Sequence, residues 1–112
     1  INLFSGKFDE SNKVFDTGKQ LIRIDNGADN LELIAIDPRQ IVLSLQELDS
    51  SMQNSFLGKI TGIIEDSNNI KLNIDIGEKI QAIITHKAFS DLKLSLRMNV
   101  WVSFKSSSIM IF

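Results

Sequence analysis

The clearest signal in the chain is an alternation of apolar and polar side chains, in which every second residue from Ile70 to Ile76 is apolar. A period of two places these apolar side chains on one face of an extended strand, while the other face meets water. Gly77 and Glu78 follow, and a second apolar-rich run occupies residues 79–84. The pattern therefore predicts two strands joined by a tight turn into a hairpin.

Shorter runs of the same kind recur along the chain and are rich in residues that favour strands. They predict further strands at residues 3–9, 19–25, 31–36, 41–45, 56–65, 99–104 and 108–112. One stretch has helical spacing: Thr85 is a typical N-cap, and Ala88, Phe89 and Leu92 follow, which predicts a helix over residues 86–92. Many short strands with one short helix favour an all-β fold closed into small barrels, since closure removes exposed strand edges.

An internal repeat organises the chain. The segment Asn2-Leu3-Phe4-Ser5-Gly6-Lys7 returns 52 positions later as Asn54-Ser55-Phe56-Leu57-Gly58-Lys59, with asparagine, phenylalanine, glycine and lysine kept. The same offset aligns a lysine and two isoleucines of the segment 19–24 with those of the segment 71–76.

Later in the chain the offset becomes 68, which aligns residues 34–37 with 102–105 and residues 41–43 with 109–111. The change of offset places an insertion in the second copy, between Ile76 and Trp101, and this insertion contains the expected helix. We therefore expect two related β units, residues 1–48 and residues 49–112.

Composition excludes several classes of function. The 112 residues suffice for one domain or two very small ones, and no apolar run is long enough to cross a membrane as a helix. The absence of cysteine and the single histidine, His86, exclude cysteine-based and histidine-rich metal sites. A net charge of −2 argues against a nucleic-acid-binding face, which normally has a strong basic excess. We expect a binding module rather than an enzyme and, because the chain opens on Ile1, a piece of a longer protein.

Two stretches of the second half carry a family resemblance. The segment Ser51-Met52-Gln53-Asn54 with Gly58-Lys59-Ile60 resembles the Ser-Ala-Arg-Asn…Gly-(Arg/Lys)-Val opening of the molybdate-binding, MOP-like TOBE domains. The segment from Val100 to Ile109, with its Lys105-Ser106-Ser107, is similar to the closing strand and Lys-Ala-Ser/Thr turn of that family.

The first half is similar to the regulatory region that follows the ATPase domain in molybdate or tungstate ABC importers. The stretch Asp37-Pro38-Arg39-Gln40-Ile41 stands where an Arg-Pro-Glu-Asp-Ile stretch is usual. The resemblance implies two tandem OB-like (TOBE/MOP-like) β-barrel units, and a regulatory oxyanion-binding domain in the ATP-binding subunit of such an importer. It also implies that the oxyanion binds between two subunits, that permease subunits are partners through the parent protein, and that the chain is cytoplasmic and peripheral to the membrane.

The sequence departs from the family pattern at three positions. Gln53 replaces the arginine of Ser-Ala-Arg-Asn, which removes a fixed positive charge and a forked donor. Lys93 and Arg97 replace glycines usual after the helix, at a cost on the order of 1 kcal/mol each if the backbone there has a positive φ.

Molybdate and tungstate are dianions without a proton to donate at neutral pH, so a site for them should offer hydrogen-bond donors and no carboxylate. The second half has such donors in two serine-rich clusters and at the expected start of the helix. The candidate oxyanion-binding residues are Ser51, Gln53, Asn54, Thr85, Lys105, Ser106 and Ser107.

The repeat provides an internal control for this assignment. Where the second copy has Lys105-Ser106-Ser107-Ser108, the first has Asp37-Pro38-Arg39-Gln40. Asp37 would repel a dianion and Pro38 has no N–H to donate. We therefore expect the first copy to lack a site.

Other interpretations stay open at this point. The three Gly-Lys pairs run into Phe8, Gln20 and Ile60, so no phosphate-loop motif is present, and ATP would bind only in a domain upstream. A TOBE domain that has lost anion binding and only holds subunits together is the main alternative, because Gln53 is neutral. In either case we expect a homodimer, to which the apolar Trp101, Met110 and Phe112 could contribute.

Overall fold

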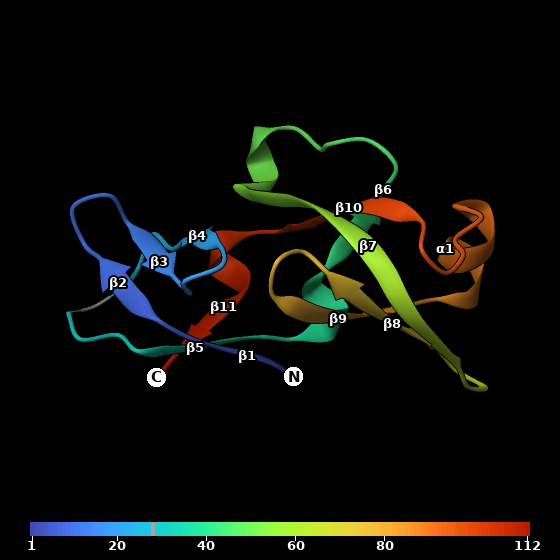
Figure 1. The fold of residues 1–112 in the computed structure, drawn as a ribbon, viewed down its shortest axis with the longest axis horizontal. Helices are drawn as coiled ribbons and strands as arrows, with labels where there is room; N and C mark the ends of the chain where they lie inside the picture. The colour runs from blue at the N-terminus through green and yellow to red at the C-terminus, as the bar shows by residue number, and fades with distance from the viewer. Residues whose placement is uncertain (28) are drawn as a thin grey trace.

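The computed structural model describes residues 1–27 and 29–112, which form an elongated molecule of 41 × 26 × 21 Å. Two β units lie end to end along the longest axis (Figure 1). In the described residues, α1 (His86–Asp91) is the one α-helix, and the rest of the regular structure is strands and 3-10 turns. The predicted all-β class with one short helix is confirmed.

The first unit contains two small antiparallel sheets. Their strands, in spatial order, are β1 (Asn2–Ser5), β5 (Leu33–Ile36) and β11 (Ile109–Ile111) in one sheet, and β2 (Lys7–Asp9), β3 (Val14–Asp16) and β4 (Leu21–Arg23) in the other.

The second unit is a larger antiparallel sheet that carries α1. Its strands, in spatial order, are β6 (Val42–Ser44), β10 (Asn99–Phe104), β7 (Asn54–Glu65), β8 (Ile70–Asp75) and β9 (Lys79–Ile84). Two 3-10 turns, η1 (Pro38–Gln40) and η3 (Ser106–Ser108), lie on the connections between the units, and a third, η2 (Ser50–Met52), joins β6 to β7 within the second unit.

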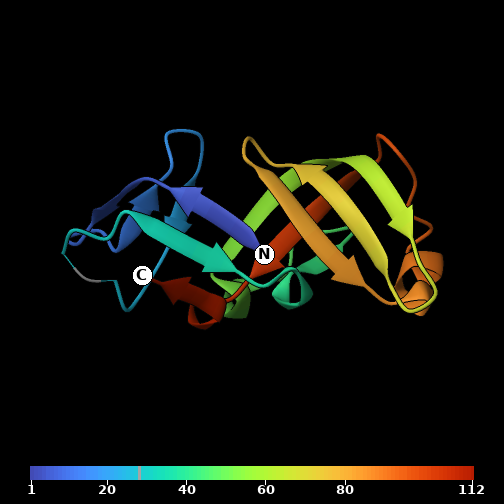
Figure 2. The same ribbon diagram turned by 90° about the horizontal axis from the view of Figure 1, so that it is seen from below.

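The two units exchange their last strands. The strand β6 follows β5 in the chain but pairs with β10 of the second unit, and β11 leaves β10 to pair with β5 of the first unit. Figure 2 shows the dark red β11 beside the teal β5, at the opposite end of the molecule from α1. The division of the sequence at residues 48 and 49 stays a prediction, since each sheet takes a strand from the other side of it.

The strand registers reproduce both offsets of the repeat. Asn2 pairs with Ile36 in the β1–β5 ladder, and Asn54 pairs with Phe104 in the β7–β10 ladder. The first members of these pairs are 52 residues apart and the second members are 68 apart. The exchanged strands follow the repeat as well. When β5 is shifted by 68 residues onto β10, and β11 is shifted back by 68 onto β6, the register of the β11–β5 ladder becomes that of the β6–β10 ladder.

One continuous hydrophobic core runs through both units. Its members come from alternating positions of the strands, as in β8, whose burial follows a strict period of two. The largest fully buried side chains are Phe15, Phe104, Ile22, Ile24, Ile34, Ile36, Ile60, Ile70, Leu72, Ile74, Ile80 and Val100. The two units therefore share a single core.

The predicted helix begins and ends close to the expected residues. The Thr85 hydroxyl accepts a hydrogen bond from the Ala88 N–H at 3.1 Å and caps the first turn. At the other end Lys93 has a φ of 53°, and the N–H of Leu94 donates to the carbonyl of Phe89, as in a Schellman motif. Arg97 has a φ of 69°. The two positions where glycine is usual therefore do have positive φ.

Two features differ from the expected strands. The strand expected over residues 3–9 is divided at Gly6, where the chain passes from one sheet to the other and a Cβ would overlap the backbone of Asp16. The strand β3 was not predicted, because its three residues are too few to show a period. No helix within residues 1–27 and 29–112 has the length and apolar character needed to cross a bilayer.

Candidate functional site

Gln53 is the residue around which the candidate site is built. Its Nε2 donates to Asp25 Oδ2 at 2.9 Å, and its Oε1 accepts from the backbone N–H of Ser106 at 3.1 Å and lies 2.6 Å from the Ser106 hydroxyl. The same hydroxyl lies 2.9 Å from Asp25 Oδ2. We call these three residues the Asp25 cluster. It joins the end of η2, the start of η3 and the residues after β4.

The backbone holds Gln53 in an unusual conformation. Its φ is 67°, in the left-handed region, which costs a residue with a Cβ about 1 kcal/mol. The hydrogen bonds to Asp25 and Ser106 fix the side chain in this position. The turn η3 begins at Lys105, and the N–H of Ser108 donates to the Lys105 carbonyl at 3.0 Å.

The electrostatics of the cluster centre on the Asp25 carboxylate. Hydrogen bonds from Ser106 and Gln53, with a smaller contribution from the Arg23 guanidinium, hold the pKa of this carboxyl below its ordinary value. Arg23 Nε lies 3.6 Å from Asp25 Oδ1, and both side chains are partly exposed to solvent. The cluster therefore carries a charged carboxylate at neutral pH.

Asn54 is committed to the fold. Its side chain is buried, its Oδ1 accepts from the Arg23 N–H at 2.7 Å and its Nδ2 donates to the Arg23 carbonyl at 3.0 Å. The amide thus bonds to the backbone of β4 in the other unit, and a contact to an oxyanion would require one of these bonds to break.

The remaining predicted residues fall into two places. Ser51, Lys105 and Ser107 are exposed on η2 and η3, next to the Asp25 cluster. Thr85 lies elsewhere, because the ladders align Ile84 with Ile70 and Ile70 with Glu65, at the far end of β7 from Gln53. Figure 1 shows α1 at the outer end of the second unit. Within one chain, the structure does not bring Thr85 to the other candidates.

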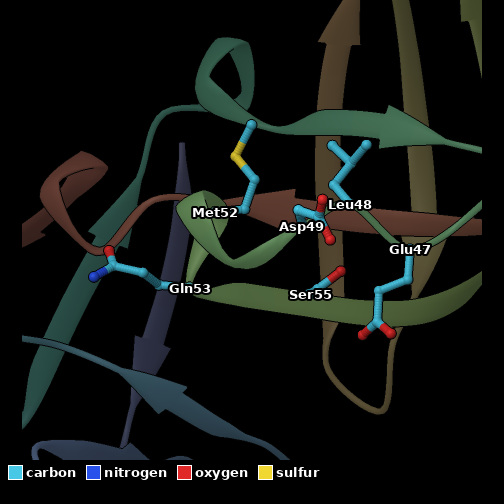
Figure 3. A pocket seen from close by; sticks show the side chains of 6 residues that line it. All are labelled: Glu47, Leu48, Asp49, Met52, Gln53 and Ser55. Carbon is cyan, nitrogen blue, oxygen red and sulfur yellow. The ribbon is translucent and has the colours of Figure 1, made fainter.

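A hollow of about 330 Å³ lies beside Gln53. Two carboxylates line it, from Glu47 and Asp49, so we call it the acidic hollow. Figure 3 shows the Gln53 amide pointing away from these carboxylates. The other lining residues are Leu48, Met52 and Ser55. The acidic hollow does not suit a dianion, and the Gln53 amide instead contacts Asp25 and Ser106.

The equivalent turn of the first copy has different chemistry. The Asp37 side chain accepts from the Arg39 N–H at 2.9 Å and caps η1. The N–H of Gln40 donates to the Asp37 carbonyl, in the same way that Ser108 bonds to Lys105. The turns η1 and η3 meet, since the Ser108 hydroxyl lies 3.4 Å from Gln40 Oε1 across an offset of 68 residues.

The sequence did not point to Asp25 or Arg23. Asp25 ends an expected strand of the first copy, and nothing local to residue 25 links it to residues 53 and 106. The pairing of Asn54 with Arg23 brings the end of β4 to Gln53. No group of three or more residues that could hold a metal ion occurs in the part of the chain that the structure describes.

Comparison with known proteins gives consistent results. The chain is 34% identical over 80 residues to the molybdate/tungstate import ATP-binding protein WtpC of Pyrococcus abyssi. This match covers 70% of the chain but 23% of the relative, so the chain spans about a quarter of that protein. Among solved structures, the fold matches the cytoplasmic molybdate-binding protein ModG, crystallised with molybdate bound, with a TM-score of 0.62.

The ModG match covers 70% of this chain and 59% of that one at 19% identity, and it confirms the OB-like fold. The family model of the TOBE domain matches residues 50–111, which include η2, α1 and η3 and thus every candidate residue of the site. The chain therefore belongs to the TOBE domain family.

Proposed function

We propose that this chain is the regulatory oxyanion-binding domain of the ATP-binding subunit of a molybdate/tungstate importer. The observation that carries the proposal is the TOBE match over residues 50–111 together with the relative that is named as a molybdate/tungstate import ATP-binding protein. The cytoplasmic molybdate-binding protein ModG, which has the same fold, supports the same ligand class. ATP would bind in a domain outside this segment, and permease subunits would be partners of the whole subunit.

The turns η2 and η3 supply the chemistry for this ligand. A tetrahedral dianion needs several hydrogen-bond donors around it. The turn η3 offers backbone N–H and hydroxyl groups, and the side chain of Lys105, immediately before the turn, adds a positive charge. Lys105 is exposed and its side chain does not cap the turn. We assign the ligand contacts to Ser51, Gln53, Lys105, Ser106 and Ser107, with Asn54 as the residue that fixes the turn in place.

A second copy of the chain completes this site. Thr85 lies at the far end of β7, so it can contact the same anion only from another copy. The Thr85 hydroxyl accepts the Ala88 N–H and keeps its own proton to donate. Exposed Met110 and Phe112, with half-buried Trp101, provide apolar surface for such a homodimer.

Regulation then follows from linkage. An oxyanion that binds between two copies favours the arrangement in which its site is closed. It shifts the equilibrium between the closed and open arrangements by the difference between its affinities for them. In a full transporter, at the cytoplasmic face of the membrane, this arrangement would hold the ATPase domains apart when the anion is abundant.

A second candidate function is a structural module that holds subunits together without a ligand. Two observations favour it: Gln53 is neutral, and the Asp25 carboxylate contacts two of the proposed donors. Each of these disfavours a dianion.

Calorimetric titration with molybdate, tungstate, sulfate and phosphate separates the two functions. We expect molybdate and tungstate to bind and sulfate and phosphate to bind more weakly or not at all. Sedimentation velocity with and without molybdate should show a dimer whose population rises with the anion. A stable dimer that binds none of the four anions would instead establish the structural module.

A further inference from the structure

Three donors of the candidate site, on Gln53 and Ser106, are already used within the chain. Asp25 Oδ2 is within hydrogen-bond distance of two of them, Gln53 Nε2 at 2.9 Å and the Ser106 hydroxyl at 2.9 Å. The third, the Ser106 N–H, donates to Gln53 Oε1 at 3.1 Å. A negatively charged oxygen of the protein thus stands where an oxygen of a bound oxyanion would receive its hydrogen bonds.

We propose that Asp25 is an internal occupant of the oxyanion site, whose carboxylate holds the donors of Gln53 and Ser106 until the oxyanion displaces it. This inference rests on the proposed function and deepens it, since it identifies Asp25 as a residue that sets the affinity for the anion. A carboxylate and a tetrahedral oxyanion present similar oxygens to the same donors, so one can replace the other.

The position of Asp25 allows the exchange. Asp25 lies two residues beyond the end of β4, its side chain is partly exposed, and it has no buried partner to lose. The other oxygen, Oδ1, lies 3.6 Å from Arg23 Nε, and Lys13 Nζ lies 3.5 Å from the Asp25 backbone carbonyl. When the carboxylate leaves, these two cations remain beside the site.

If the Asp25 carboxylate stayed in place, it would weaken the binding of the oxyanion. A carboxylate next to a dianion repels it, and in a partly screened site one such contact changes the affinity by about 10- to 100-fold. The affinity of the wild-type chain is therefore reduced by the work of displacing Asp25. A transporter regulated in this way responds only when the oxyanion is abundant.

The test is titration of the 112-residue chain with molybdate in the wild type and in the variants Asp25→Asn, Glu47→Gln and Glu32→Gln. Asp25→Asn removes the charge that contacts the donors and keeps the shape of the side chain. Glu47→Gln removes a charge from the acidic hollow, and Glu32→Gln removes an exposed charge from the first unit, without contact to the donors. We expect Asp25→Asn to tighten binding at least about tenfold and each control to change it less than about threefold.

A measurement on the wild type does not depend on any variant. The side-chain amide signal of Gln53 and the carboxyl signal of Asp25 in NMR spectra should both move as molybdate saturates the protein, because their hydrogen bond breaks.

The outcomes separate the two proposals. Binding in the wild type with unchanged or weaker binding in Asp25→Asn would overturn the role of Asp25 and leave the proposed function standing. Binding that leaves both NMR signals in place would do the same. No binding in the wild type but binding in Asp25→Asn would support the role of Asp25, whereas no binding in either protein would overturn both proposals.

Discussion

Asn2 and Asn54 occupy equivalent positions in the two copies of the repeat, and each side-chain amide makes two hydrogen bonds to a backbone residue of the opposite unit. Asn2 bonds to the N–H and carbonyl of Gln81, both at 2.8 Å. Asn54 bonds to the N–H and carbonyl of Arg23 at 2.7 and 3.0 Å. The asparagine that the repeat keeps therefore makes an equivalent contact between the units in each copy.

Replacement of either asparagine by alanine should destabilise the whole chain. Both side chains are buried, so each replacement leaves a backbone N–H and a carbonyl without partners. We expect Asn2→Ala and Asn54→Ala each to lower the free energy of unfolding by about 1–3 kcal/mol, measured by urea denaturation. Asn68→Ala, at an exposed turn, is the control and should cost less than about 0.5 kcal/mol. A large loss at one asparagine only would show that the two contacts are not equivalent.

The exchanged strands predict that the two halves of the sequence fold together. A fragment of residues 1–48 lacks β11, which pairs with β5, and a fragment of residues 49–112 lacks β6, which pairs with β10. We expect each fragment alone to show little strand signal by circular dichroism and an equimolar mixture to regain it. Independent folding of either fragment would mean that the exchanged strand is dispensable.

The residue after α1 offers a stabilising substitution. Lys93 has a φ of 53° in the Schellman motif, where glycine has no steric cost. Lys93→Gly should raise the free energy of unfolding by about 1 kcal/mol, measured by thermal and urea denaturation. Lys93→Ala removes the same charge but keeps the Cβ, so it should change stability little. An equal gain in both variants would trace the effect to charge instead.

Much of the fold could be predicted from local patterns. The strand β8 shows its period of two in the sequence, and Thr85 marks the start of α1 because capping depends on neighbouring residues only. The exchange of β6 and β11 left no trace in the sequence, because both strands have similar apolar patterns and either sheet could accept either strand. Long-range pairing is decided by the shared core, which a local pattern does not contain.

The candidate site was predictable in part for the same reason. Gln53 and Ser106 were expected together because both lie in segments that resemble motifs of one family, and they are in contact. Asp25 belongs to the other copy, and its position depends on how the two units meet at Asn54 and Arg23. The contact of Asp25 with Gln53 and Ser106 depends on how the strands of the two units are aligned, so it can be recognised only once the fold is known.

The charge of Asp25 should also stabilise the folded state in a pH-dependent way. Its pKa is lower in the folded chain, because of Ser106, Gln53 and Arg23, than the value of about 4 expected when unfolded. Its contribution is therefore complete above the unfolded pKa and is lost as the pH falls through the folded pKa.

We expect the wild type to have a higher Tm than Asp25→Asn at pH 7, and the difference to shrink towards zero in acid. The pKa values of Asp9 and Asp66 are lowered as well, but these groups are present in both proteins and cancel in the comparison. A difference in Tm that is constant with pH would show that the carboxylate charge has no part in it.

The last prediction separates a local anion site from a general effect of charge. Lys105→Glu places a negative charge on η3, where a positive one stood beside the proposed ligand, and in a partly screened site this should weaken molybdate binding by about two decades or more. Arg39→Glu makes the same change of charge on η1, the equivalent turn of the first copy, where Asp37 caps the turn and Pro38 has no N–H. Because the proposed ligand contacts lie on η3 and not on η1, only screened repulsion across the contact between the two turns remains, and we expect less than about a threefold loss by calorimetry. Equal losses in the two variants would mean that bulk electrostatics governs the affinity, and an unchanged affinity in Lys105→Glu would remove η3 from the site.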